Sequence, residues 1–128
     1  MLMPPFELHR PKTVSEACAI AKELMSAGYE FDWIAGGTDL IPNYKWHINS
    51  KPHVISLAGV DGLSDISMTE IGCMARLHDI AESQNVHPIV SEAASKVASS
   101  LIRRNATLGG NLCLDTRCFW FNQTEEWR

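Results

Sequence analysis

Apolar residues near the start of the chain recur at helical spacing and predict an amphipathic helix. Thr13 and Glu16 form a T-x-x-E capping box, which is typical of a helix N-terminus, and Gly28 suits the C-terminal cap. The apolar stripe between them comprises Val14, Ala17, Cys18, Ala21, Leu24 and Met25. We therefore expect the helix to bury this stripe, with Cys18 as a small core residue rather than a reactive thiol.

Three short apolar segments around this helix predict strands. They are residues 6–8, 31–35 and 54–57. Together with the helix and a short helix start after the second strand, they give the order β-α-β-α-β. This order favours parallel strands joined by right-handed crossovers. Residues 1–58 are thus predicted to form a small β-α-β subdomain.

Residues 59–128 predict a second subdomain of mixed structure. Residues 63–74 alternate weakly between apolar and polar positions, as strands do, and glycines punctuate them as turns. A short helix is predicted at 77–81, and a longer one starts near Pro88, which suits a first helical turn. The apolar stripe of the longer helix is rich in alanine and favours close packing on a sheet. It comprises Val90, Ala93, Ala94, Val97, Ala98 and Leu101.

Composition and charge exclude several classes of protein. A chain of 128 residues that is 45% hydrophobic can bury one ordinary globular core. Its 11 basic and 15 acidic side chains give a formal net charge of −4, which argues against a nucleic-acid partner. No apolar run approaches the roughly 20 residues of a membrane helix, and no secretory signal is visible. We expect a cytoplasmic protein without a membrane partner and with reduced cysteines.

The segment AGGTDL, residues 35–40, places two glycines between a predicted strand and a helix start. Glycines allow a ligand to approach the backbone, and successive N–H groups in such a turn can point at an anion. Thr38 adds a hydroxyl donor, whereas Asp39 would repel a phosphate unless its carboxylate caps N–H groups. Taken alone, the segment is more often a tight strand-to-helix turn than a ligand site.

The segment TLGGN, residues 107–111, repeats this arrangement, and Asn111 adds an amide with donor and acceptor capacity. A diphosphate with flanking sugar hydroxyls needs several backbone donors and a few neutral polar side chains. Two such segments converging on one ligand would supply them. Arg103 and Arg104 precede the second segment, and we interpret them as helix C-terminal charges that complement the dipole.

Cysteines and histidines offer weaker candidates for chemistry. Cys113 and Cys118 have C-x4-C spacing, and thiolates suit zinc or iron–sulfur clusters, but two ligands complete neither kind of site. The histidines at 9, 47, 53, 78 and 87 are scattered, without an i,i+4 pair. We interpret them as surface or packing residues and assign no catalytic residue.

The motif AGGTDLIP, with RRNATLGGNLC later in the chain, resembles the FAD-binding subunit of the molybdenum hydroxylase (xanthine dehydrogenase) family. The resemblance implies the amino-terminal part of an α+β, PCMH-type fold of two subdomains, with subdomain 1 at 1–58 and an incomplete subdomain 2 at 59–128. It also implies an electron-transfer role beside molybdenum-binding and 2Fe-2S subunits. The FAD-binding residues that it implies are Ala35, Gly36, Gly37, Thr38, Asp39, Leu40, Thr107, Gly110 and Asn111.

The tail CLDTRCFWFNQTEEWR resembles the β subunit of 4-hydroxybenzoyl-CoA reductase, a branch that holds a 4Fe-4S cluster in a cysteine-bearing loop. Cys118 matches the first cluster ligand, and Cys113 matches less clearly. The resemblance places the remaining cluster cysteines beyond Arg128, so we do not expect a complete cluster here.

The resemblance also places later FAD contacts beyond the end of the chain. We therefore expect no autonomous catalysis, and FAD binding that is weak or needs a partner chain to complete both segments. Exposed apolar surface, above all in the aromatic tail, leads us to expect self-association. The alternative is a flavin-free interaction module that binds itself or another protein.

Overall fold

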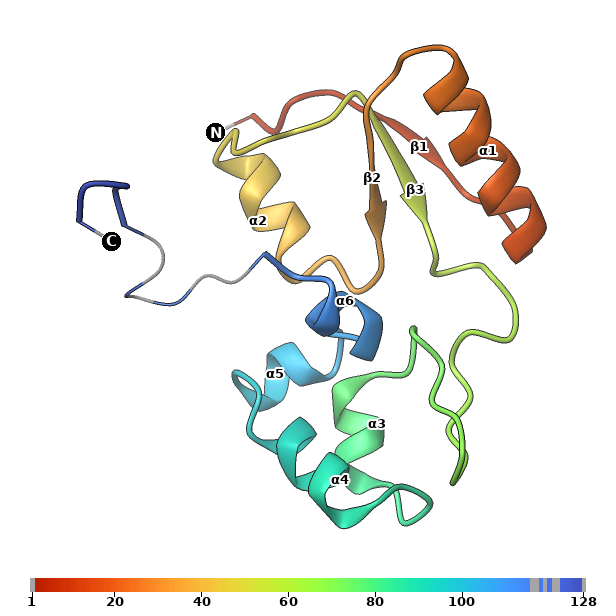
Figure 1. Ribbon diagram of the computed structural model, residues 1–128, viewed down its shortest axis with the longest axis vertical. Coiled ribbons are helices and arrows are strands. Elements are labelled where there is room, and N and C mark those ends of the chain that lie inside the picture. Colours follow the sequence, from red (N-terminus) through yellow and green to blue (C-terminus); the bar gives the residue numbers. More distant parts are fainter. Residues whose placement is uncertain (1, 116–117, 119, 121–122, 128) are drawn as a thin grey trace.

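A three-stranded sheet and a group of short helices make up the described part of this computed structural model, residues 2–115, 118, 120 and 123–127 (Figure 1). The elements in chain order are β1 Glu7–His9, α1 Val14–Ser26, β2 Phe31–Ile34, α2 Leu40–Lys45, β3 His53–Ser56, α3 Leu77–Glu82, α4 Pro88–Ser95, α5 Ser100–Arg103 and α6 Leu108–Leu112. The predicted α+β class is confirmed. Every helix in this part of the chain falls short of the length and apolar character that a bilayer crossing requires.

The sheet has the strand order β1-β3-β2, and both strand pairs are parallel, as predicted. The central strand β3 carries the buried Val54 and Ile55, because a central parallel strand is covered on both faces. On one face, Ala21 and Leu24 of α1 pack against Ile55. On the other face lies α2, whose Tyr44 is buried (Figure 1).

Helix α1 begins as the capping box predicts. The Oγ1 atom of Thr13 accepts a hydrogen bond from the N–H of Glu16 at 3.1 Å, and the Glu16 carboxylate accepts one from the N–H of Lys12 at 2.7 Å. The buried stripe is narrower than predicted and consists of Ala17, Ala21 and Leu24. Cys18 and Met25 are exposed, so the prediction that they pack in the core is wrong. A sheet of three short strands covers only one narrow line of the helix.

The second half of the described chain is helical rather than mixed. Helices α3 and α4 pack on each other around a core of Ala75, Leu77, Ile80, Ala94 and Ala106. The predicted packing of the alanine-rich helix on a sheet is therefore wrong. That helix also ends early, because Ala98 has a φ of 46° and breaks the chain into α4 and α5. Residues 63–74 contribute one isolated bridge, between Ile66 and Ile71, in place of the predicted strands.

Candidate functional site

The two glycine segments lie against each other where the sheet meets the helices. Gly36 is so close to Asn105 that a Cβ atom on Gly36 would overlap the Asn105 carbonyl oxygen and lie 3.2 Å from the Cα of Ala106. A Cβ atom on Gly110 would lie 3.8 Å from the Cβ of Ala35. Figure 1 shows α6, which contains Gly110, next to the end of β2. The structure therefore brings together the two segments that the sequence keeps far apart.

The first glycine segment, residues 35–40, leaves backbone donors uncommitted. Gly37 has a φ of 72°, a conformation that glycine adopts at little cost, and its carbonyl accepts from the N–H of Ile41 at 3.1 Å. The N–H groups of Gly36, Gly37 and Thr38 donate to no acceptor among the described residues. All three residues are partly buried. Three adjacent amides thus have no acceptor within the part of the chain that the structure describes.

Asp39 and Leu40 close this segment by starting α2. Asp39 occupies the N-cap position, yet its side chain makes no capping hydrogen bond. Its Oδ2 atom instead accepts from Nδ2 of Asn43 at 3.0 Å. The one carboxylate of the segment is therefore paired along the helix.

The second glycine segment, residues 107–111, is a capped short helix rather than an open turn. Thr107 is 3% exposed, and its Oγ1 atom accepts from the N–H of Gly110 at 3.1 Å. The Gly110 N–H, which the resemblance assigns to the ligand, thus donates to Thr107 instead. Gly109 packs on Cys73, since a Cβ atom on Gly109 would lie 2.8 Å from the Cβ of Cys73. The exposed Asn111 is the polar side chain that this segment offers to a ligand.

Main-chain hydrogen bonds hold the second glycine segment in place. The N–H of Leu77 donates to the carbonyl of Ala106, and the N–H of Leu108 donates to the carbonyl of Ala75, both at 2.9 Å. Arg76 and Thr107 form the antiparallel bridge between these two contacts. This pairing, which local sequence patterns did not predict, fixes the segment against the core around α3.

The two arginines before this segment have different surroundings. The guanidinium of Arg103 donates to the carbonyls of Val97 and Ala98 at 2.8 and 3.1 Å, so it closes the turn between α4 and α5. This supports the structural interpretation of Arg103. Arg104 lines a shallow hollow of about 240 Å³ together with Arg76 and the acidic Asp79.

The tail contributes exposed groups. Cys113 and Cys118 are both at the surface. Trp120 and Trp127 stack with ring centroids 5.8 Å apart and are 70% and 53% exposed. The tail positions 116–117, 119, 121–122 and 128 lie outside the described residues. The assignment of Cys118 as a cluster ligand stays a prediction.

Tyr44 anchors the C-terminal end of α2 to the sheet. Its hydroxyl donates to Oδ2 of Asp32 at 2.8 Å and accepts from the N–H of Lys51 at 3.0 Å. Burial disfavours the phenolate and is the main cause that raises the pKa of Tyr44 to about 12. The hydrogen bond from Lys51 opposes this shift and the Asp32 carboxylate adds to it. Tyr44 is therefore a neutral structural residue and does not transfer protons near neutral pH.

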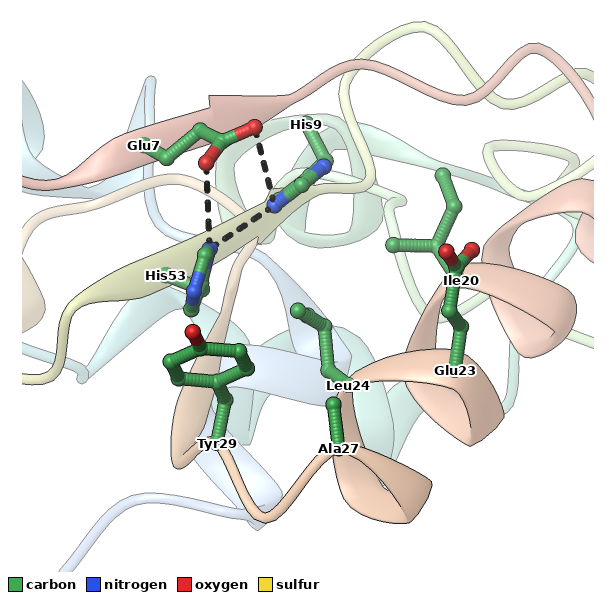
Figure 2. A pocket seen from close by; sticks show the side chains of 8 residues that line it. All are labelled: Glu7, His9, Ile20, Glu23, Leu24, Ala27, Tyr29 and His53. Carbon is green, nitrogen blue, oxygen red and sulfur yellow. Dashed lines mark hydrogen bonds and ion pairs between the residues drawn. The ribbon is translucent and has the colours of Figure 1, made fainter.

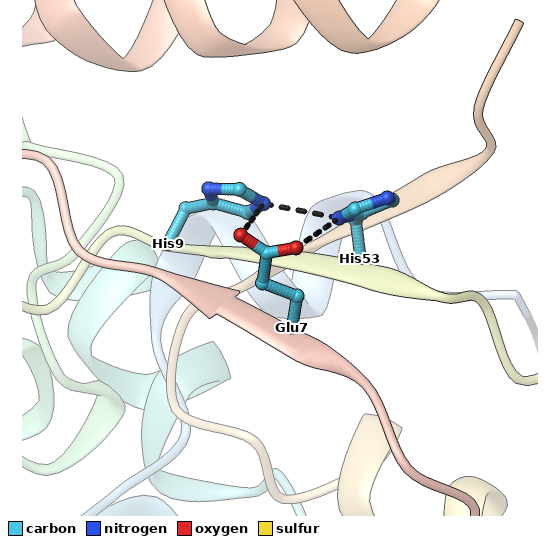
Figure 3. Close-up of side chains that lie close together, drawn as sticks. All are labelled: Glu7, His9 and His53. Atoms are coloured by element: carbon cyan, nitrogen blue, oxygen red, sulfur yellow. Dashed lines mark hydrogen bonds and ion pairs between the residues drawn. The ribbon is translucent and has the colours of Figure 1, made fainter.

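Sequence reasoning missed one cluster of functional interest, formed by Glu7, His9 and His53 on the α1 face of the sheet (Figure 3). Both histidines had been interpreted as isolated surface or packing residues. The i,i+2 spacing of Glu7 and His9 on a strand places them on one face. Only the register between β1 and β3 brings His53 to them, and no local pattern contains that register.

The sequence is similar to those of known FAD-binding domains and subunits. The family model for the FAD binding domain in molybdopterin dehydrogenase matches residues 4–118. The carbon monoxide dehydrogenase medium chain of Hydrogenophaga pseudoflava is 33% identical over 119 residues, which is 88% of this chain and 40% of that protein. The aldehyde oxidoreductase FAD-binding subunit PaoB of Escherichia coli (strain K12) is 33% identical over 132 residues, 97% of this chain and 40% of that protein.

The fold agrees with these sequence similarities. The CO dehydrogenase structure from Oligotropha carboxidovorans superposes with a TM-score of 0.78 at 30% identity, over 87% of this chain and 40% of that chain. The chain thus spans about 40% of the length of the relatives that it matches. The resemblance to the molybdenum hydroxylase flavin subunits is confirmed at this level. The chain belongs to the family of FAD-binding domains of molybdopterin dehydrogenases.

Proposed function

We propose that this chain is the FAD-binding, electron-transferring part of a molybdenum-containing oxidoreductase. One observation carries the proposal: Ala35 lies next to Gly110, and Gly36 packs on the residues just before the second glycine segment. The amides of residues 36–38 beside this contact have no acceptor among the described residues. We call the contact between the two glycine segments the junction, and family membership supports FAD as its ligand. FAD supplies the redox chemistry when bound, so the chain needs no acid or base of its own.

The residues at the junction fit such a ligand chemically. The amides of Gly36, Gly37 and Thr38 would donate hydrogen bonds to diphosphate oxygens, because adjacent N–H groups in a turn form an anion-binding concavity. The hydroxyl of Thr38 and the amide of Asn111 would pair with neutral hydroxyl groups. Ala35, Asp39 and Leu40 shape the first glycine segment around these donors.

Thr107 and Gly110 act on the position of the second glycine segment rather than on the ligand. Their mutual hydrogen bond holds the first turn of α6, and α6 presents Asn111. We therefore refine the expected site: Thr107 and Gly110 are positioning residues, and Asn111 is the contacting residue.

Relatives named as medium chains and FAD-binding subunits suggest a larger assembly. We propose that molybdenum-binding and 2Fe-2S subunits are the partners of this chain in electron transfer.

The tail motif supports a narrower proposal, membership of the branch that resembles 4-hydroxybenzoyl-CoA reductase. In that branch Cys118 would be a ligand of a 4Fe-4S cluster, and its exposed thiol is accessible to one. A cluster needs four protein ligands. Anaerobic treatment with iron and sulfide tests this role: a 4Fe-4S absorbance that is lost in Cys118→Ser supports it, and an absorbance that Cys118→Ser leaves unchanged contradicts it.

Titration of the purified chain with FAD, followed by quenching of flavin fluorescence, tests the binding site. Asn111→Ala removes the exposed amide of the second glycine segment, and Asn85→Ala removes an exposed amide elsewhere. We expect Asn111→Ala to weaken binding by about fivefold, the loss of one hydrogen bond of roughly 1 kcal/mol, and Asn85→Ala to leave affinity unchanged. Equal affinities for the two variants, or no quenching at millimolar FAD, would contradict the assignment.

The alternative function, a flavin-free module that self-associates, has its own supporting observation. Several large apolar side chains are well exposed, among them Leu101 at 75%, Leu112 at 73% and Trp120 at 70%. Light scattering after size exclusion would then report dimers or larger species. A colourless protein that associates and ignores added FAD favours this alternative, whereas a protein that binds FAD favours the flavin subunit.

A further inference from the structure

The cluster of Glu7, His9 and His53 lies on the α1 face of the sheet, at the end opposite the glycine segments (Figure 3). Glu7 and His9 are two positions apart on β1, so their side chains point to the same face of the sheet. His53 opens β3 and stands in register with Glu7. Backbone pairing therefore directs the three side chains to one point, without a contribution from a flexible loop.

The donor atoms are spaced as ligands of one metal ion. Nε2 of His9 lies 3.2 Å from Nδ1 of His53, and the Glu7 carboxylate oxygens lie 4.0 Å from the first atom and 3.6 Å from the second. Tetrahedral ligands at about 2.0–2.2 Å from zinc are about 3.3–3.6 Å apart. The imidazoles thus already have this spacing, and the exposed Glu7 needs only a small rotation. Within the described residues, this is the one group of three such side chains.

The electrostatics of the cluster also favour a cation. Nε2 of His9 and Nδ1 of His53 lie at hydrogen-bond distance, so one of these nitrogens donates and the other accepts. The Glu7 carboxylate, which can only accept hydrogen bonds, then faces an imidazole nitrogen that is itself an acceptor. No proton lies between these two acceptors. A cation satisfies both imidazole lone pairs and the carboxylate at the same time.

The cluster is accessible from a pocket, and a neighbouring aromatic ring packs against His53. The three side chains border a pocket of about 230 Å³ between the sheet and α1 (Figure 2). The Tyr29 ring packs edge-on against His53 at 4.9 Å, and Glu23 adds a second carboxylate to the lining. None of the described residues that line this pocket is a lysine or an arginine.

We propose that Glu7, His9 and His53 bind a divalent transition-metal ion of the zinc class, with a fourth coordination position open to this pocket. Imidazole with one carboxylate is a donor set that suits zinc. The ion would join the edge strand β1 to the central strand β3, and because the register is preformed, it would stabilise this corner of the sheet. This site is separate from the proposed flavin site and does not depend on it.

Calorimetric titration of the full chain with Zn²⁺, under reducing conditions, tests the proposal. We expect one ion per chain, and we expect Glu7→Gln and His53→Gln each to weaken binding by roughly tenfold or more, since removal of even an outer partner of a ligand costs about that much. His47→Asn alters an exposed histidine at a backbone position with a φ of 56° that asparagine tolerates, and it should bind as the parent chain does.

Cysteines are the main competing ligands, so the titration is repeated with Co²⁺. Thiolate ligation gives a charge-transfer band, which should be missing at the first equivalent, while the NMR imidazole signals of His9 and His53 should shift. A thiolate band at the first equivalent, unchanged affinity in both cluster variants, or no binding would overturn the proposal. Glu7 is exposed, so Glu7→Gln leaves the fold intact and keeps the test valid if His53→Gln fails to fold.

Discussion

Replacement of Gly36 by alanine should force the two glycine segments apart. The new Cβ atom would overlap the carbonyl oxygen of Asn105 and lie 2.8 Å from its carbonyl carbon and 3.2 Å from the Cα of Ala106. An ordinary contact begins near 3.4 Å, so relief of the clash with the carbonyl carbon alone needs a shift of about 0.6 Å, and the oxygen needs more. These are backbone atoms, and the Ala106 carbonyl is held by the N–H of Leu77. No side chain can rotate away.

The expected loss of unfolding free energy is therefore at the upper end of the range for overpacking, about 3 kcal/mol. Urea unfolding followed by circular dichroism measures it. Gly59→Ala is the matched control, because its Cβ atom would lie 3.5 Å from the Pro11 carbonyl oxygen, an ordinary contact. FAD affinity should fall in the Gly36 variant and not in the control. If both variants unfold at the same urea concentration, the two segments are not packed as described.

Two further substitutions test the supports of the site. Tyr44→Phe removes both hydrogen bonds of a buried hydroxyl and should cost about 1–3 kcal/mol at pH 7 in urea unfolding. Since the folded pKa is about 12 and the unfolded value about 10, the native state holds the proton more tightly. The difference in unfolding free energy between the parent chain and Tyr44→Phe should persist below pH 10 and shrink as the pH rises towards 12. A constant difference across that range would contradict the assigned pKa shift. Thr107→Val removes the cap of Gly110 and should cost about 1 kcal/mol, whereas Thr107→Ser should retain most of that stability in the same assay.

Local chemistry explains why much of the first half of the fold could be predicted. The capping box of Thr13, the left-handed Gly28 and the short apolar strands act over a few residues, and each has the predicted position to within one or two residues. The width of the buried stripe on α1 depends on the size of the sheet that covers it. Cys18 therefore lies at the surface although its spacing suggested a core position.

In the second half of the chain, local sequence patterns did not predict which elements pack together. Of the alanines that suggested packing on a sheet, only Ala94 is buried, and it packs in the core with α3 instead. The left-handed Ala98 follows the end of α4 without a glycine or proline to signal it. Pairing between positions far apart in the chain, such as Arg76 with Thr107 or Glu7 with His53, decides the rest. Such pairs depend on register, which a single sequence does not contain.

The structure also changes the physical reason for the glycines of the candidate site. The sequence suggested that they admit a ligand to the backbone, yet Gly36 and Gly109 are required by their contacts with Asn105 and Cys73, and Gly37 is required by its φ. The glycines thus build the junction, and the junction leaves the amides of residues 36–38 uncommitted. We therefore expect folding and ligand binding to be coupled at the proposed site. A ligand that joins both segments should stabilise their contact, and a substitution that separates them should weaken binding even where it touches no ligand atom.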